Sequence, residues 1–271
     1  MDIFAYAYMQ RAMVAGVLIG GLCAVIGVYV VLKGLSFIGA GISHASFGGV
    51  AIGLALGVNP VWAAIVFCLG VGWGIGVVSR RGQVKEDTAV GIFFASTMAL
   101  GVLIIGLMQG YQVDLMSYLF GSILAVTRQD LWTTVVIAAI VLGCVAVFYK
   151  DLMFVTFDSE MAQVTGVPAD KLYFLLISLM ALVVVMSIKV VGIVLVSALV
   201  VTPAAAAFQL TESFRRMMAL SAAFGVGSCV FGLVIADWLN IAPGATIVLL
   251  ATLLFFVSWA LSARRRKSAT A

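Results

Sequence analysis

Apolar residues run along this chain in long blocks, and charged residues gather in the short stretches between them. A helix needs roughly 20 apolar residues to cross the hydrocarbon of a bilayer. Cutting the sequence at its charges leaves segments of about that length at 12–32, 34–57, 60–79, 89–109, 131–149, 172–188, 192–210, 218–236 and 244–262. The pattern predicts an all-α fold, a polytopic membrane helix bundle with about nine transmembrane helices.

One further stretch, residues 111–127, does not fit the pattern cleanly. It is apolar but interrupted by Asp114 and Gly121, and non-helical backbone is tolerated at membrane depth only where protein or water surrounds it. The stretch is therefore either a span or a re-entrant, broken helix, and the exact helix count stays open.

The composition agrees with a membrane protein and excludes a water-soluble one. Of 271 residues, 64% are hydrophobic and 10% are charged, whereas soluble domains carry about 25% charged residues. The formal net charge of +4 does not indicate nucleic-acid binding, because the basic residues lie between apolar segments. We expect residues 1–271 to form a single transmembrane domain.

The distribution of lysine and arginine predicts the orientation, since cytoplasmic loops of membrane proteins are enriched in both. With the N-terminus outside and the C-terminus in the cytoplasm, twelve of the 15 basic residues fall on the inner side, including those of the tail 264–271. Only Arg11, Arg128 and Lys189 then lie outside.

His44 is the only histidine, and it lies about ten residues into the segment 34–57. At about 1.5 Å per residue it is roughly 15 Å from the start of that helix, near the middle of the membrane. Ionisable groups at that depth usually face the protein interior or an aqueous path, and imidazole is a good ligand for transition metals. A histidine bonded to a neighbouring helix for packing remains an equal alternative.

Two acidic residues, Asp114 and Asp237, are predicted at the outer ends of spans, where carboxylates would attract a cation to the mouth of a pathway. Ordinary loop acids would look the same. The sequence contains no glycine-rich phosphate-binding loop with its lysine and serine or threonine. Any coupling to ATP is therefore expected from a partner.

The stretch VVTPAAAAFQLTESFRRMMALS joins two spans on the predicted inner side. Pro203, the alanines after it and the charged turn at 211–216 suggest a short helix lying at the inner face. Such a helix could dock into the groove of a partner.

Several stretches together resemble the permease family of bacterial metal-uptake ABC transporters for zinc, manganese and iron. They are VLKGLSFIGAGISHASFGGVAIGLALGVNP, EDTAVGIFFAS, VDLMSYLFGSILAVT, MAQVTGV, KVVGIVLVSALVVTPAAAA and APGATIVLLATLLF.

The resemblance implies a fold similar to that of the cobalamin and iron-siderophore importers, in the bacterial inner membrane. It implies a homodimer with two cytoplasmic ATP-binding subunits and an extracytoplasmic metal-binding protein. The region 203–217 would contact the ATPase, with the coupling residues Pro203, Ala204, Ala205, Thr211, Glu212, Arg215 and Arg216.

Three positions depart from the family pattern and bear on the metal. Ala40 stands where many members have an acidic residue, Ala95 where some zinc-type members have a histidine, and Ser122 where an aspartate is common. The metal would then rely on His44 and Asp114, with Ser43, Ser122 and Asp237 along the pathway. The likeness of the stretch VDLMSYLFGSILAVT favours zinc as the transported ion, with manganese or iron as the alternative, and no prosthetic group is expected.

Two other functional classes agree less well with the sequence. A channel or gradient-driven carrier would place charged groups inside several spans as relays, and only His44 is clearly within one. An intramembrane metalloenzyme would need paired ligands such as those of the H-E-x-x-H motif, which a single histidine cannot supply.

Overall fold

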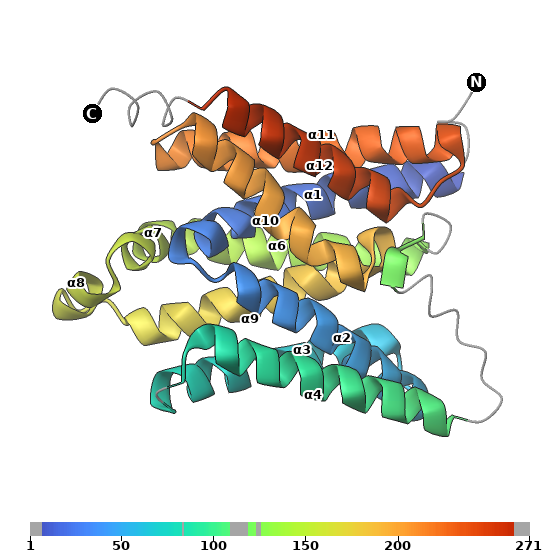
Figure 1. Cartoon of the computed structure of the whole chain (residues 1–271), viewed down its shortest axis with the longest axis horizontal. Helices are drawn as coiled ribbons and strands as arrows, with labels where there is room; N and C mark the ends of the chain where they lie inside the picture. Colours follow the sequence, from blue (N-terminus) through green and yellow to red (C-terminus); the bar gives the residue numbers. More distant parts are fainter. Residues whose placement is uncertain (1–6, 83, 109–118, 123–125, 263–271) are drawn as a thin grey trace.

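The computed structural model describes residues 7–82, 84–108, 119–122 and 126–262, and α-helix is the only regular structure in that part of the chain. Figure 1 shows the helices running mostly along the long axis of the molecule. They are α1 (Ala7–Lys33), α2 (Ser36–Ala55), α3 (Pro60–Arg81), α4 (Glu86–Leu107), α6 (Arg128–Val147), α7 (Tyr149–Phe157), α8 (Ser159–Val164), α9 (Ala169–Val191), α10 (Ile193–Leu210), α11 (Phe214–Leu239) and α12 (Pro243–Ala260).

Within the described residues, 9 helices are long and apolar enough to cross a membrane. All except α7 and α8 qualify, and the predicted bundle of about nine transmembrane helices is confirmed. Several helices begin before the apolar segments, because the first turn of a span also takes polar residues. Helix α11, for example, begins at Phe214 and includes Arg215 and Arg216 in its first turn.

Local capping chemistry explains where two of the spans begin. Pro60 occupies the first turn of α3, and the Asn59 side chain accepts a hydrogen bond from the Val61 N–H at 3.0 Å. At the start of α6, the Thr127 hydroxyl oxygen and the Asp130 carboxylate accept hydrogen bonds from each other's backbone N–H groups.

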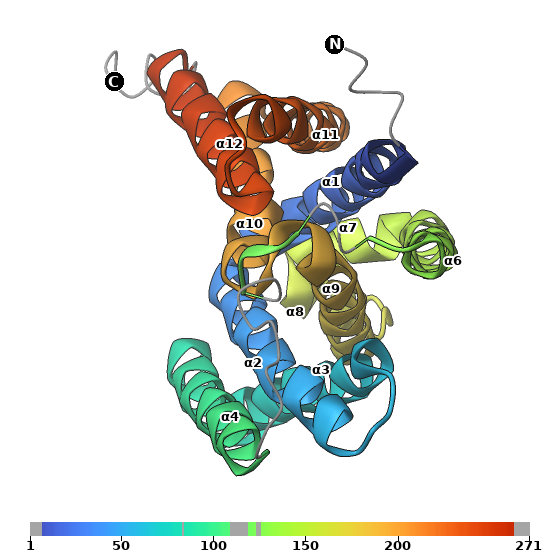
Figure 2. The same cartoon turned by 90° about the vertical axis from the view of Figure 1, so that its right-hand side faces the viewer.

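Close helix packing depends on glycines, as is common in membrane bundles. A Cβ atom added to Gly20 of α1 would lie 2.6 Å from the carbonyl oxygen of Gly225 in α11. On the other side of the molecule, a Cβ on Gly49 of α2 would lie 2.6 Å from the Cα of Ala64 in α3. Figure 2 shows α9 and α10 between the group α1, α11 and α12 and the group α2, α3 and α4.

The prediction of a short helix at the inner face, beginning at Pro203, is wrong. Pro203 is buried inside α10, which continues to Leu210 before the turn that leads to α11. Membrane helices tolerate an internal proline because neighbouring groups satisfy the freed backbone carbonyl, and the alanines that follow favour a helix. The short helices of the described chain are instead α7 and α8, between α6 and α9.

Candidate functional site

His44 lies within α2, on the side where α2 packs against α4, and it is half-buried. Its ring Nδ1 is 2.9 Å from the carbonyl oxygen of Ala40, four residues earlier. A carbonyl oxygen can only accept, so Nδ1 carries the proton and donates it. The lone pair of the neutral ring is then on Nε2, which is the arrangement found when histidine binds a metal.

The His44 ring lies against the ring of Phe94 from α4. The two ring centroids are 4.6 Å apart, and the planes are tilted by 59°. Phe94 is itself 37% exposed, and among the described residues it is the aromatic side chain in ring contact with the imidazole. Access to His44 therefore depends on where α4 lies.

Ser43, the neighbour of His44, is fully buried. Its hydroxyl donates a hydrogen bond to the carbonyl oxygen of Ile193, the first residue of α10. This bond fixes the middle of α2 to the junction between α9 and α10. A role for Ser43 in the pathway stays a prediction.

The junction between α9 and α10 is a point where three backbone segments meet. Gly192 has a φ of 93° and Gly121 a φ of 77°, values that L-residues with a side chain rarely adopt. A Cβ on Gly121 would lie 2.5 Å from the carbonyl oxygen of Val190, and one on Gly244, at the start of α12, would lie 2.6 Å from that of Phe120. The described residues 119–122 are thus packed between α9, α10 and α12.

The other predicted metal and pathway residues lie in different parts of the chain. Asp114 lies outside the described residues. Ser122 is half-buried beside the glycine junction, and Asp237 is half-buried near the end of α11. In the described part of the chain, no three histidine, cysteine, aspartate or glutamate side chains come together as a metal cage.

At the opposite end of the bundle from that junction, α7 and α8 form a surface with the turn 211–216. Phe214 contacts both Tyr149 and Phe157 of α7, with ring centroids 5.7 and 6.0 Å apart. Phe157, Met161 and Val164 are exposed on α7 and α8. We call this surface, α7, α8 and 211–216, the end surface.

The predicted coupling residues divide between two environments. Pro203 and Ala204 are buried in α10, and Ala205 is half-buried beside them. The remaining residues lie on or next to the end surface, where the two arginines and the glutamate are exposed and the threonine is half-buried; they are Thr211, Glu212, Arg215 and Arg216.

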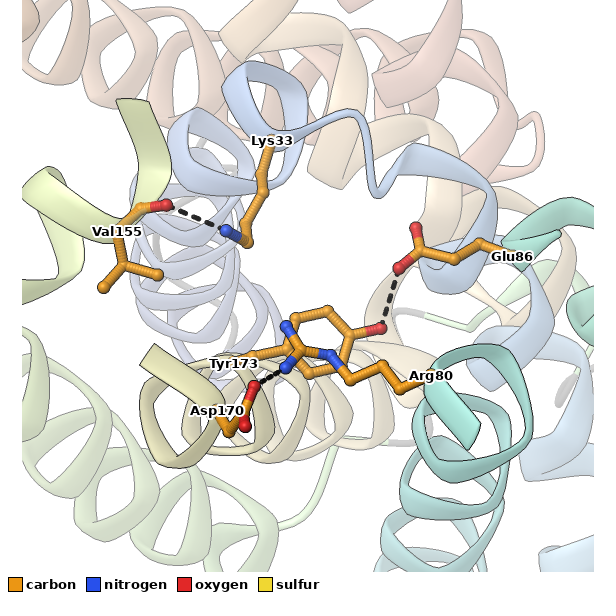
Figure 3. Close-up of polar contacts among 6 residues, drawn as sticks. All are labelled: Lys33, Arg80, Glu86, Val155, Asp170 and Tyr173. Atoms are coloured by element: carbon orange, nitrogen blue, oxygen red, sulfur yellow. Dashed lines mark hydrogen bonds and ion pairs between the residues drawn. The ribbon is translucent and has the colours of Figure 1, made fainter. Parts of the chain in front are cut away.

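A chain of polar contacts at the same end joins α3, α4 and α9 (Figure 3). The Tyr173 hydroxyl donates a hydrogen bond to Glu86 Oε1 at 3.0 Å, and the Arg80 guanidinium lies 4.0 Å above the Tyr173 ring. Arg80 also forms an ion pair with Asp170. The sequence places these charges at helix ends on one side of the membrane, but nothing in it predicts their pairing.

A second polar contact at this end involves the corner between α1 and α2. The Lys33 ammonium donates a hydrogen bond to the carbonyl oxygen of Val155 in α7 at 2.9 Å, also drawn in Figure 3. The corner itself turns at Gly34, which has a φ of 74°. Lys33 therefore connects the end surface to the helix that carries His44.

These features define a multi-pass helical membrane protein with an imidazole inside one of its spans. The chain belongs to the ABC 3 transport family, whose profile matches residues 5–262. The resemblance to permease subunits of metal-uptake ABC transporters is thereby confirmed.

Relatives and a solved structure match nearly the whole chain. The "Manganese transport system membrane protein MntC" of Halalkalibacterium halodurans is 41% identical over 264 residues, covering 97% of this chain and 90% of the relative. The "Chelated iron transport system membrane protein YfeD" of Yersinia pestis is 36% identical over 255 residues, covering 94% and 86%. The structure described as PsaBC from Streptococcus pneumoniae in complex with Fab has a TM-score of 0.88 at 34% identity, covering 97% of this chain and 95% of that chain.

Proposed function

We propose that this chain is the permease subunit of an importer that moves a divalent transition metal into the cytoplasm, with manganese as the first candidate. The family, the matching fold and the names of the manganese and chelated-iron relatives support this proposal. The preference for zinc drawn from the sequence has no support from those relatives. Zinc and iron are therefore the alternatives.

The observation that carries the proposal is the orientation of His44. Its Nδ1–H bond to Ala40 leaves Nε2 as a metal ligand inside a membrane span. A single imidazole does not make a tight cage, so the ion keeps water or backbone oxygens as its other ligands. Weak, partial coordination suits transport, because an ion that binds too tightly does not leave.

Energy is proposed to come from two ATP-binding subunits on the end surface, which would be the cytoplasmic face. The exposed apolar side chains Phe157, Met161 and Val164 are suited to a groove in a partner. The basic residues Arg215 and Arg216 lie next to that surface, as expected for a cytoplasmic loop. A second copy of the chain and an extracytoplasmic metal-binding protein complete the proposed assembly.

Uptake in proteoliposomes tests the proposal directly. We expect ATP-dependent accumulation of manganese when the permease, its ATPase and the binding protein are present, and none when the ATPase is left out. Equal uptake with and without the ATPase would reject the proposal in favour of a gradient-driven carrier. Stronger uptake of zinc or iron than of manganese would change the assigned metal but not the mechanism.

The variant His44→Ala tests the metal contact. We expect uptake to fall by about tenfold or more, the scale on which metal sites respond to loss of their supporting groups. Co-purification with the ATPase is the control and should be unchanged, because His44 is remote from the end surface in the fold. Normal uptake by His44→Ala would reduce His44 to a packing residue.

A further inference from the structure

Helix α4 is the span least enclosed by the rest of the molecule. Of its 22 residues, only Ala89, Val90, Thr97 and Gly101 are buried. Among the described helices, α2 and α3 are the two that make substantial contacts with α4. The packing of α4 on α2 is close, since a Cβ on Gly48 of α2 would lie 2.8 Å from the carbonyl oxygen of Thr97, so a shift of α4 over α2 also needs the contacts at its end to be released.

The end contact of α4 is the bond between Glu86 and Tyr173. Among the described residues, this is the one hydrogen bond from an α4 side chain to another helix, since Ser96 and Thr97 bond within α4. Glu86 lies in the first turn of α4, and Tyr173 is almost fully buried in α9. A bond to a charged acceptor is stronger than one between neutral groups.

The position of Tyr173 is supported by Arg80 from α3 and by Asp170 from its own helix. The Arg80 guanidinium covers its ring, and Asp170 holds Arg80 by an ion pair. These contacts keep the hydroxyl directed toward Glu86 (Figure 3). The arrangement is a latch: a rigid donor on α9 and an acceptor on α4.

The same helix that carries the acceptor also covers His44. Phe94 lies eight residues after Glu86, which is about 12 Å along the helix, and its ring contacts the imidazole with 4.6 Å between the ring centroids. A displacement of α4 at its Glu86 end therefore moves Phe94 relative to His44.

We propose that α4 is the moving part of a gate at the cytoplasmic side, held shut by the Glu86–Tyr173 bond, with Phe94 covering His44 while the gate is shut. This inference rests on the proposed function, because it takes His44 as the metal contact. Release of the bond lets α4 swing from α9, uncovers His44 and opens the way inward. Glu86 and Tyr173 are positioning residues, since they act on His44 through α4 and Phe94.

The test uses Tyr173→Phe, which removes the hydroxyl and leaves the ring beneath Arg80. The matched control is Tyr29→Phe, because the Tyr29 side chain is also buried and its hydroxyl has no hydrogen-bond partner among the described residues. Both changes delete one oxygen from a buried tyrosine. A difference between them reports the bond to Glu86.

The sample is the permease assembled with its ATPase in nanodiscs. The readout is the rate at which diethyl pyrocarbonate modifies the single histidine of the chain, measured by peptide mass spectrometry. We expect Tyr173→Phe to raise that rate roughly tenfold, the change in an equilibrium that loss of such a bond gives. Tyr29→Phe should match the unaltered chain. Phe94→Ala should also raise the rate, because the cover itself is gone.

Equal modification of His44 in Tyr173→Phe and Tyr29→Phe would overturn the gate. If Tyr173→Phe does not assemble, Glu86→Ala breaks the same bond from the α4 side and takes its place. Uptake separates this outcome from failure of the proposed function. If the gate is opened by Tyr173→Phe, metal uptake per ATP hydrolysed should fall. Normal uptake by His44→Ala would refute the metal contact at His44. The modification rates would then still decide whether the Glu86–Tyr173 bond holds α4.

Discussion

Gly192→Ala is a sharp test of the junction between α9 and α10. The residue has φ 93° and ψ 152°, a region open essentially to glycine alone, and an L-residue with a side chain there costs about 1–3 kcal/mol. The new Cβ would also lie 2.5 Å from the backbone nitrogen of Gly121 and from the carbonyl carbon of Phe120. Overpacking of this kind costs about 1–3 kcal/mol.

The two effects together predict a loss of about 2–6 kcal/mol, a large part of the roughly 5–15 kcal/mol that stabilises a folded protein. Thermal unfolding in detergent, followed by tryptophan fluorescence, measures it. We expect the melting temperature to fall by about 4 °C or more for a chain of this length.

Gly227→Ala is the matched control for that measurement. Gly227 lies within α11, and a Cβ added there meets no atom within 4 Å. Alanine also favours a helix over glycine by up to about 1 kcal/mol, so the control should melt at the same temperature or higher. A Gly192→Ala protein that melts like the unaltered chain would refute the three-way backbone contact at the junction.

Two further predictions concern helix packing and capping, and both use the same melting assay. Gly20→Ala should lower the melting temperature, because the new Cβ would meet the rigid carbonyl oxygen of Gly225 at 2.6 Å, whereas Gly21→Ala meets its nearest neighbour only at 3.7 Å and should have little effect. Thr127→Ala should cost about 1 kcal/mol by removing the cap of α6, while Thr133→Ala, whose hydroxyl bonds only within the helix, should cost less. A reversed order in either pair would contradict the assigned contact.

The proposed gate gives the end surface a route to the metal site. Lys33 connects α7 to the corner that leads into α2, and the latch residues lie at the same end of the bundle. Movement of an ATPase against α7 and α8 would therefore reach both α2 and α4. His44 and Phe94 lie between those two helices.

The sequence predicted the helical bundle well because burial in lipid imposes a simple rule. Each span must be long, apolar and internally hydrogen-bonded, and all nine predicted segments correspond to helices of the structure. The wrong prediction at Pro203 also comes from the difference between water and lipid as the surroundings of a helix. In water a proline usually ends a helix, and the local pattern contains no sign that neighbouring helices enclose this one.

The site was predicted only in part. His44 stands out in the sequence as the one ionisable group deep in a span. The stretch 111–127 stayed undecided, and the structure describes only part of it, as a segment packed at the glycine junction. The junction is formed at Gly121, Gly192 and Gly244. The chain has 28 glycines, and the sequence alone does not indicate which of them meet.

The amino-acid sequence by itself indicated that this protein lies in lipid, that it has about nine spans and that one histidine lies inside a span, because each of these depends on local composition. Tertiary structure alone decided that Phe94 lies against the His44 ring and that Tyr173 holds Glu86. The two interhelical contacts join residues 50 and 87 positions apart in the sequence. Such contacts follow from how helices pack, and no periodicity along the chain encodes that.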